Sequence, residues 1–207
     1  MSSPRKRGPD HQTTRMKRVL LLLLSTLALG SCRCDDPILI DMGPIPDSIL
    51  ALVPYQDGQV YQFRHSAGKV ITYAAHRALH EEYFDCERCC KFLYKYQVNQ
   101  TALVPDYPVF TLNVQLSNPD SSRLEFSAWM GQRGFNLSMN QDDGNPVDRI
   151  DSAWIGEQWH KDVLRIRNSN YFGFSRDSIY ADTLYYNYQS GILKIVMSNG
   201  EYFQIHE

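Results

Sequence analysis

Apolar and polar side chains alternate along most of the chain after residue 54. The alternation is clearest at 92–98, 110–116, 124–128 and 135–139, where every second residue is apolar. Successive side chains of a β-strand point to opposite faces of the sheet, so this pattern predicts strands with one buried and one solvated face. Strands buried on both faces, as in parallel sheets, would show continuous apolar runs instead. The pattern therefore predicts an all-β protein with an antiparallel sheet.

Short segments of turn-forming residues separate the predicted strands, at 66–69, 118–121, 156–157 and 198–200. The Asn-Gly pair in the last of them is a strong signal for a tight hairpin. Together with the alternating segments, these turns predict an antiparallel meander of about ten short strands. Such a sheet covers its apolar face and its edges by closing into a barrel or by folding over into a sandwich. The sequence leaves both arrangements open.

Two segments fit helical spacing as well as strand spacing. Residues 74–84 carry Ala75, Leu79 and Tyr83 at intervals of four, which would place them on one face of a helix. Residues 146–159 are similarly ambiguous. We expect the second segment to form strands, and we leave the first open.

The first 31 residues have the pattern of an export signal. Lys17 and Arg18 precede an 11-residue apolar run at 19–29. This run is long enough for a secretory signal and shorter than the roughly 20 residues that span a bilayer. The polar residues 1–15 precede a second methionine, Met16, which we take as the true start. Residues 1–31 are therefore expected to be removed.

The end of the apolar run, Leu29-Gly30-Ser31-Cys32, resembles the lipobox of bacterial lipoproteins. The resemblance implies that Cys32 carries lipid on its sulfur and becomes the new N-terminus. Each buried methylene of an acyl chain contributes about 0.8 kcal/mol, and two or more chains anchor a protein stably. Arg33, rather than Asp, follows the cysteine, so the usual sorting rule implies the outer membrane, at its periplasmic or its cell-surface face.

Residues 32–54 contain four prolines, which disfavour both helices and paired strands. We predict a lipidated tether here, with apolar residues of 38–40 and 49–53 resting on the core. Residues 55–207 are then predicted to form a single β domain. Without residues 1–31 the chain keeps 176 residues, which is enough for one core.

The charge balance excludes nucleic acid as a partner. Six of the 21 basic residues and one of the 23 acidic residues lie within residues 1–31, so the mature chain has a net charge of −7. Nucleic-acid phosphates and anionic lipid surfaces require clusters of lysine and arginine. We therefore expect membrane contact only through the lipid on Cys32.

The remaining cysteines are Cys34, Cys86, Cys89 and Cys90. An even number in an exported chain predicts two disulfides, and Cys34 is the distant partner for the cluster. Its bridge would attach the tether to the domain and close a loop of about 50 residues. The alternative is a thiol-redox protein, or a zinc or copper site in which the cluster is joined by His76 or His80.

Other candidate groups do not form a recognisable site. The chain contains no nucleophile-elbow, phosphate-loop or dinucleotide-binding motif, so no catalytic residue and no cofactor is predicted, although a hydrolase site built from scattered residues stays open. Residues 142–145 and Asp148 have the composition of a calcium loop without its spacing, and we expect a turn. The histidines are expected on strands or on the surface. Those after residue 31 are His65, His76, His80, His160 and His206.

The chain contains 25 aromatic residues, all of them after residue 31. Many alternate inward, but the sequence leaves open whether six of them line an open face or pack in the core. The six are Trp154, Trp159, Tyr180, Tyr185, Tyr186 and Tyr188. Exposed tyrosine and tryptophan provide large contact areas at low entropic cost, which suits a protein or glycan ligand.

Residues 151–166, 182–195 and 198–205 resemble the C-terminal part of uncharacterised β-rich bacterial lipoproteins. In these a Tyr-Tyr strand leads through a glycine to a Gly-Ile-Leu-Lys strand and a final glycine turn, here Tyr185 to Lys194 and then Gly200. The resemblance implies β architecture and a location in the cell envelope, and it implies no activity. We therefore expect a lipid-anchored, non-catalytic binding or structural protein. The alternative is a metal-binding or thiol-redox protein that uses Cys86, Cys89 and Cys90.

Overall fold

The computed structural model describes residues 37–85, 92–117, 123–130, 133–138, 146–168 and 179–206. The chain divides into two compact units. The larger unit, Leu39–Phe84 with Tyr94–Glu207, contains nearly all of the described residues and carries the features discussed below. No helix among the described residues is long and apolar enough to cross a membrane.

Of the described residues, 70% lie in β-strands and 3% in a helix, which confirms the predicted all-β class. The sheet has 12 strands and is accompanied by the short helix α2 (Asp47–Leu50). The first strands are β1 (Ile38–Asp41), β2 (Val60–His65), β3 (Val70–Asp85), β4 (Phe92–Pro105), β5 (Thr111–Ser117) and β6 (Arg123–Met130). The others are β7 (Arg133–Ser138), β8 (Val147–Ile155), β9 (Gln158–Arg167), β10 (Ile179–Asn187), β11 (Gly191–Met197) and β12 (Tyr202–Ile205).

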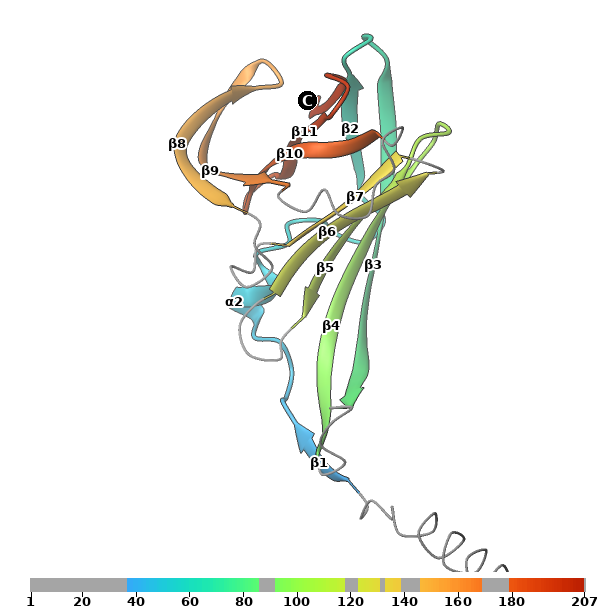
Figure 1. The fold of residues 1–207 in the computed structure, drawn as a ribbon, viewed down its shortest axis with the longest axis vertical. Helices are drawn as coiled ribbons and strands as arrows, with labels where there is room; N and C mark the ends of the chain where they lie inside the picture. The colour runs from blue at the N-terminus through green and yellow to red at the C-terminus, as the bar shows by residue number, and fades with distance from the viewer. Residues whose placement is uncertain are drawn as a thin grey trace, which may run out of the picture. The chain divides into compact units, whose positions relative to one another are not determined.

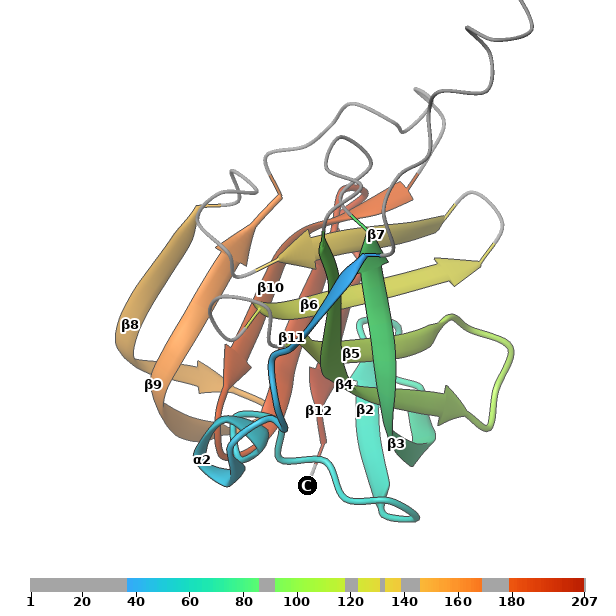
Figure 2. The same ribbon diagram turned by 90° about the horizontal axis from the view of Figure 1, so that it is seen from below.

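The sheet is antiparallel and curled into a half-barrel (Figure 1). Its strand order is β11-β12-β2-β3-β4-β5-β6-β7-β10-β9-β8, and β1 pairs with β4. Strand β10 also pairs with β11, and it meets β7 in a short parallel contact at Ile179 and Tyr180. Strands β5 and β6 run across the direction of β11 and β12, as Figure 2 shows. The sequence left a barrel and a sandwich open, and the structure shows a half-barrel.

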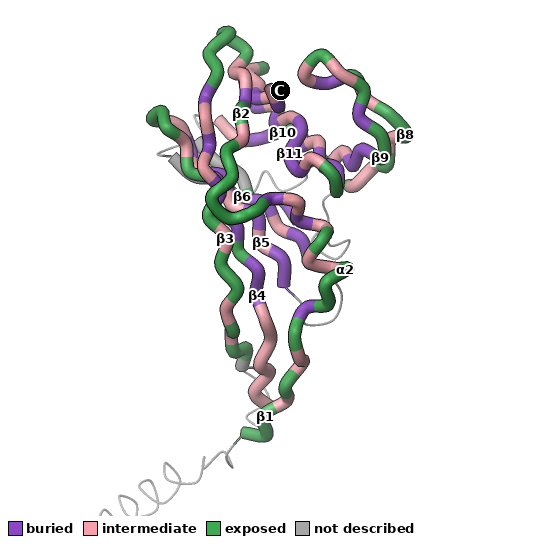
Figure 3. Tube along the Cα trace, turned by 180° about the vertical axis from the view of Figure 1, so that it is seen from behind, coloured by how far each residue is buried: buried purple, intermediate pink, exposed green. Residues whose placement is uncertain are grey.

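The predicted alternation is confirmed at 110–116 and 124–128, whereas at 92–98 it is not, because residues 92–97 of β4 are all half-buried. Phe110, Leu112, Val114 and Leu116 are all buried, as are the apolar residues at 124–128. In Figure 3 the buried positions concentrate on β5, β10 and β11. Large aromatic side chains fill the inside of the curl, and the Phe126 and Tyr186 rings lie 5.0 Å apart. The predicted turns at 66–69, 156–157 and 198–200 are present, and 118–121 lies outside the described residues.

The two ambiguous segments are both strands. Residues 74–84 belong to β3, so the helical spacing within them is not realised. Strand β3 begins in register with β2, with Val70 opposite Arg64 and Ala74 opposite Val60. Pairing with neighbouring strands on both sides thus overrides the local spacing. Residues 146–159 contain all of β8 and the start of β9, as expected.

The expectation that four prolines exclude regular structure from residues 32–54 is wrong. This segment contains β1 and α2. Pro46 precedes the first helical residue, a position where a missing N–H costs nothing, so it starts the helix rather than preventing it. Ile45 and Val53 are buried in the core, whereas Ile38 and Leu39 are exposed. The end of the segment is therefore part of the domain's core.

Candidate functional site

The hairpin formed by β8 and β9 carries the most distinctive surface of the described residues. Its two-residue turn, Gly156 and Glu157, has positive φ at both positions (62° and 74°), as in the tight turns that match the twist of paired strands. Two contacts fix the turn against the sheet. Gly156 packs closely against the backbone of Ile205, so that an added Cβ would lie 2.4 Å from the Ile205 carbonyl oxygen. The Glu157 carboxylate pairs with Arg64 at 2.8 Å.

Two tryptophans lie directly opposite each other beside this turn. Trp154 of β8 pairs in register with Trp159 of β9, and their ring centroids are 5.6 Å apart in an edge-to-face arrangement. Their neighbours Ile155 and His160 are buried, so the indoles occupy the opposite, outward face of the hairpin. Trp154 is 58% exposed and Trp159 is 67% exposed.

The tryptophan pair has polar neighbours on the same face. Ser152 and Lys161 form the cross-strand pair two residues along, and both are exposed. Two exposed indoles beside a hydroxyl and an ammonium group can stack on a ligand and hydrogen-bond to it at the same time. We call these four residues, Ser152, Trp154, Trp159 and Lys161, the aromatic platform.

Burial excludes one of the other aromatic candidates, Tyr186, from any open face. Tyr186 is fully buried, and its hydroxyl donates a hydrogen bond to the Leu52 carbonyl. Burial and the neighbouring Tyr55 raise the pKa of Tyr186 well above its usual value, so it remains a neutral donor. Tyr188 is exposed, and Tyr180 and Tyr185 are half-buried. The possibility that all six aromatics line one open face is therefore wrong for Tyr186, whose side chain completes the core instead.

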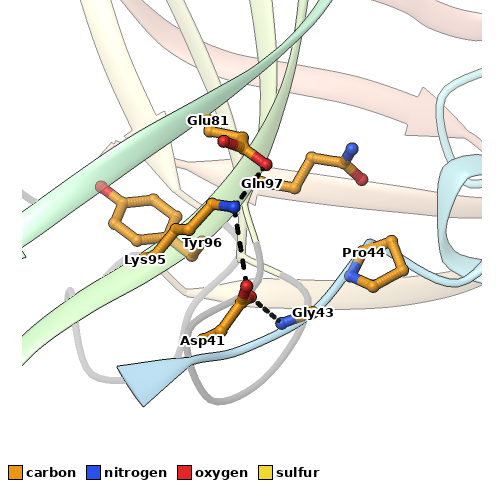
Figure 4. Close-up of a pocket in the computed structure, with 7 residues that line it drawn as sticks. All are labelled: Asp41, Gly43, Pro44, Glu81, Lys95, Tyr96 and Gln97. Carbon is orange, nitrogen blue, oxygen red and sulfur yellow. Dashed lines mark hydrogen bonds and ion pairs between the residues drawn. The ribbon is translucent and has the colours of Figure 1, made fainter. Parts of the chain in front are cut away.

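A second site is a cleft of about 220 Å³ beside Lys95 (Figure 4). Lys95 of β4 lies between two carboxylates, with its Nζ 2.8 Å from Glu81 of β3 and 3.5 Å from Asp41 of β1. The Asp41 carboxylate also accepts the Gly43 N–H at 2.9 Å. The remaining lining residues are Pro44, Tyr96 and Gln97.

The electrostatics of this cleft favour a structural role for Lys95, the attachment of β1 to the sheet, over a catalytic one. The hydrogen bond to Glu81 is the main cause that raises the pKa of Lys95, and the charge of Asp41 adds to it. The pKa of Asp41 is lowered, mainly by the Gly43 N–H and then by Lys95. A lysine with a raised pKa stays protonated and is a poor nucleophile. The backbone carbonyl of Lys95 accepts the Met42 N–H. Through this bond and its two ion pairs, Lys95 connects β1 to β3 and β4.

The histidines and acids of the described residues do not assemble into a metal site. No group of three or more His, Cys, Asp or Glu that could hold a metal is found among them. His160 is buried and lies 3.2 Å from the Ile155 carbonyl oxygen, and His80 pairs with Glu82. Asp148 pairs with Arg165 at 2.7 Å and with Arg167 at 3.1 Å.

All five cysteines lie outside the described residues, as do residues 142–145. The lipidation of Cys32 and the pairing of Cys34, Cys86, Cys89 and Cys90 therefore stay predictions. No protein family, curated protein or solved structure matches this chain. The geometry of the described residues and the sequence must therefore support any functional proposal by themselves.

Sequence reasoning singled out both tryptophans but did not pair them. The signal was present, because Trp154 and Trp159 flank Ile-Gly-Glu-Gln symmetrically and a two-residue turn at Gly-Glu puts them opposite each other. The Lys95 cleft was missed. Its three charged residues come from three strands, so no local pattern marks it.

Proposed function

We propose that this protein is a lipid-anchored, non-catalytic binding protein of the cell envelope. The anchor is the lipid on Cys32, and the location is the outer membrane, supported by the export signal and by Arg33. The aromatic platform is the ligand-contacting surface. The observation that carries this function is the exposure of two paired indoles on a hairpin whose end is fixed to the sheet.

The proposed ligand is a glycan. An indole face packs against the C–H groups of a sugar ring, and the hydroxyl and ammonium groups of Ser152 and Lys161 provide hydrogen bonds to sugar hydroxyls. The two indole planes are inclined at 67° to each other, and polar groups lie beside them. A polysaccharide of the cell envelope is within reach of a membrane-anchored protein, so it is the natural first probe.

Replacement of both platform tryptophans tests this proposal. The wild-type protein is expected to co-sediment with purified peptidoglycan, and the Trp154→Ala/Trp159→Ala variant to bind at least about tenfold more weakly, as for central contact residues. Because both side chains are exposed, the free energy of unfolding should stay within about 1 kcal/mol of the wild-type value. Binding is measured by quantifying protein in the pellet, and stability by urea unfolding.

Leu79→Ala is the matched control, because Leu79 is also a large exposed apolar residue but lies on β3. It should bind like the wild type. Equal binding by the wild type and the double variant would contradict the platform's role. If the wild type did not bind peptidoglycan but bound a purified envelope protein, the ligand would be a protein and not a glycan.

We also propose that Cys34 is joined to the cysteine cluster. The Met42 N–H bonds to the Lys95 carbonyl and the Ile45 N–H to the Gln97 side chain, so residue numbers rise in the same direction along both segments. The chain therefore enters β1 and β4 from the same side. Cys34 precedes β1 by four residues, and Cys89 and Cys90 precede β4 by three and two.

A thiol count separates this bridge from the metal-binding or thiol-redox alternative. The exported protein is denatured in chelator without reductant, alkylated and weighed intact. We expect no alkyl adducts, because two disulfides would occupy all four cysteines. Three or four adducts would mean that the thiols are kept free, and metal binding by Cys86, Cys89 and Cys90 would become the favoured function.

A further inference from the structure

The end of β3 and the start of β4 form a ribbon that extends beyond the core. The Arg77 guanidinium bonds to Asn99, and four residues further along each strand Glu81 pairs with Lys95, so the two strands keep one antiparallel register. None of residues 76–84 is buried, and β4 begins with a half-buried run. Figure 3 shows this change along β4, where buried positions give way to half-buried ones toward β1.

Three large apolar side chains at the end of this ribbon are each more than half exposed. They are Leu39, Tyr83 and Phe84, which we call the apolar tip. The Lys95 ammonium joins Asp41 of β1 to Glu81 of β3. Leu39 lies two residues before Asp41, and Tyr83 lies two residues after Glu81. Because β1 and β4 run in the same direction and β3 runs in the opposite one, both lie beyond this ion cluster, at the end where the chain enters β1.

The proposed lipid on Cys32 brings a bilayer close to the apolar tip. Leu39 follows Cys32 by seven residues, and an extended chain spans at most about 3.6 Å per residue, so the two lie within about 25 Å of each other. In an anchored protein the contact between tip and membrane is intramolecular in character, with a high effective concentration. A contact that is too weak to recruit a free protein is then still occupied.

The side chains of the apolar tip suit the boundary between lipid headgroups and acyl chains. Tyrosine is enriched at membrane interfaces, and phenylalanine and leucine bury apolar area there. Tyr83 and Phe84 are consecutive residues of a strand, so they point to opposite faces of the ribbon. A protein partner would cover one face, whereas insertion of the ribbon's end into a bilayer surface covers both.

The charges near the apolar tip favour a neutral lipid surface. The Glu82 carboxylate accepts the Tyr96 hydroxyl at 3.0 Å and lies 3.1 Å from His80 Nε2, and Glu81 pairs with Lys95. Partnered charges cost less to bring toward an apolar phase than isolated ones. The net charge of −7 on the mature chain disfavours an anionic surface and leaves an apolar contact open.

We propose that the apolar tip inserts among the headgroups of a zwitterionic bilayer beside the lipidated cysteine. The acyl chains and the tip then hold the protein at two places. A protein held by acyl chains and a tether alone can face any direction, whereas the second contact keeps the end of the ribbon on the membrane. This contact rests on the proposed lipid at Cys32, and it does not depend on the aromatic platform or its ligand.

Photocrosslinking to lipid tests this contact. The full lipidated protein, with benzoylphenylalanine in place of Phe84, is reconstituted into vesicles of phosphatidylcholine and phosphatidylethanolamine and illuminated. We expect lipid adducts in the intact mass spectrum. The same probe in place of Val60 is the matched control, because Val60 is 60% exposed and pairs with Ala74, about 33 Å back along β3 from Phe84. No adducts above background are expected there.

Leu39→Ser combined with Tyr83→Ser is expected to lower the adduct yield at position 84 severalfold, because it removes most of the remaining apolar area of the tip. Circular dichroism checks that each variant is folded, and the mass spectra verify the acyl chains on Cys32. An acylated protein without adducts at position 84 would overturn the contact and leave the anchor standing. Equal yields at positions 84 and 60, or a yield unchanged by the two serines, would also overturn it. Absence of acyl chains would contradict the anchor itself, and this contact with it.

Discussion

Gly191→Ala is expected to lower the free energy of unfolding by about 3–5 kcal/mol. Gly191 begins β11 with a φ of 80°, and a Cβ there would lie 2.3 Å from the hydroxyl oxygen of Tyr55 and 2.4 Å from its Cζ. Tyr55 cannot move aside easily, because it is fully buried and its hydroxyl accepts the Ile192 N–H at 2.6 Å. The alanine therefore meets both backbone strain and overpacking. Urea unfolding measures the loss.

Gly200→Ala is the matched control for the backbone contribution. Gly200 has a φ of 86°, and a Cβ there would meet no atom within 4 Å. Its loss should be about 1 kcal/mol, from the left-handed conformation alone. Equal losses for the two variants would show that contact with Tyr55 contributes nothing, and would contradict the packing of residues 51–55 into the core.

Arg77→Met is expected to cost about 3–5 kcal/mol of unfolding free energy, because it leaves buried acceptors without a donor. The Arg77 guanidinium donates to Asn99 Oδ1 at 3.0 Å and to the backbone carbonyls of Tyr55 at 3.2 Å and Leu50 at 3.4 Å. It thus connects β3 and β4 to the end of the proline-containing segment. Methionine preserves much of the aliphatic volume and supplies no donor.

Arg77→Lys separates charge from geometry. A lysine keeps the positive charge but lacks the planar guanidinium that reaches several acceptors. We therefore expect the free energy of unfolding of this variant to lie between that of the wild type and that of the methionine variant. Hydrogen exchange should show faster exchange in residues 45–55 in both variants, and more so with methionine. A methionine variant as stable as the wild type would mean that these carbonyls are satisfied without Arg77.

The fixed end of the proline-containing segment bears on the proposed function. Residues 45–55 are held by core packing, by Arg77 and by the Tyr186 hydroxyl, while Lys95 attaches β1. If the chain is anchored through Cys32, a force between the anchor and the domain would therefore be transmitted to β4 and the core. Only residues before β1 would remain as a tether, which is shorter than the predicted one.

The sequence by itself predicted the elements whose evidence is local. The alternation at 110–116 and 124–128 identified strands and their buried face, because side-chain direction in a strand follows from the backbone geometry of that strand alone. The turns at 156–157 and 198–200 were found for the same reason, since Gly156 and Gly200 readily adopt the positive φ that these turns require. Both signals depend on a few consecutive residues.

The tertiary structure decided the rest, because those outcomes depend on pairing between distant segments. Residues 74–84 became a strand through pairing in the sheet, and Tyr186 became a core residue through contact with Phe126 and Leu52, 134 positions away. The choice of a half-barrel rests on the contacts of β10 with β7, β9 and β11. The cleft around Lys95 joins three strands that no local pattern connects, since side chains far apart in the sequence meet only when the sheet has formed.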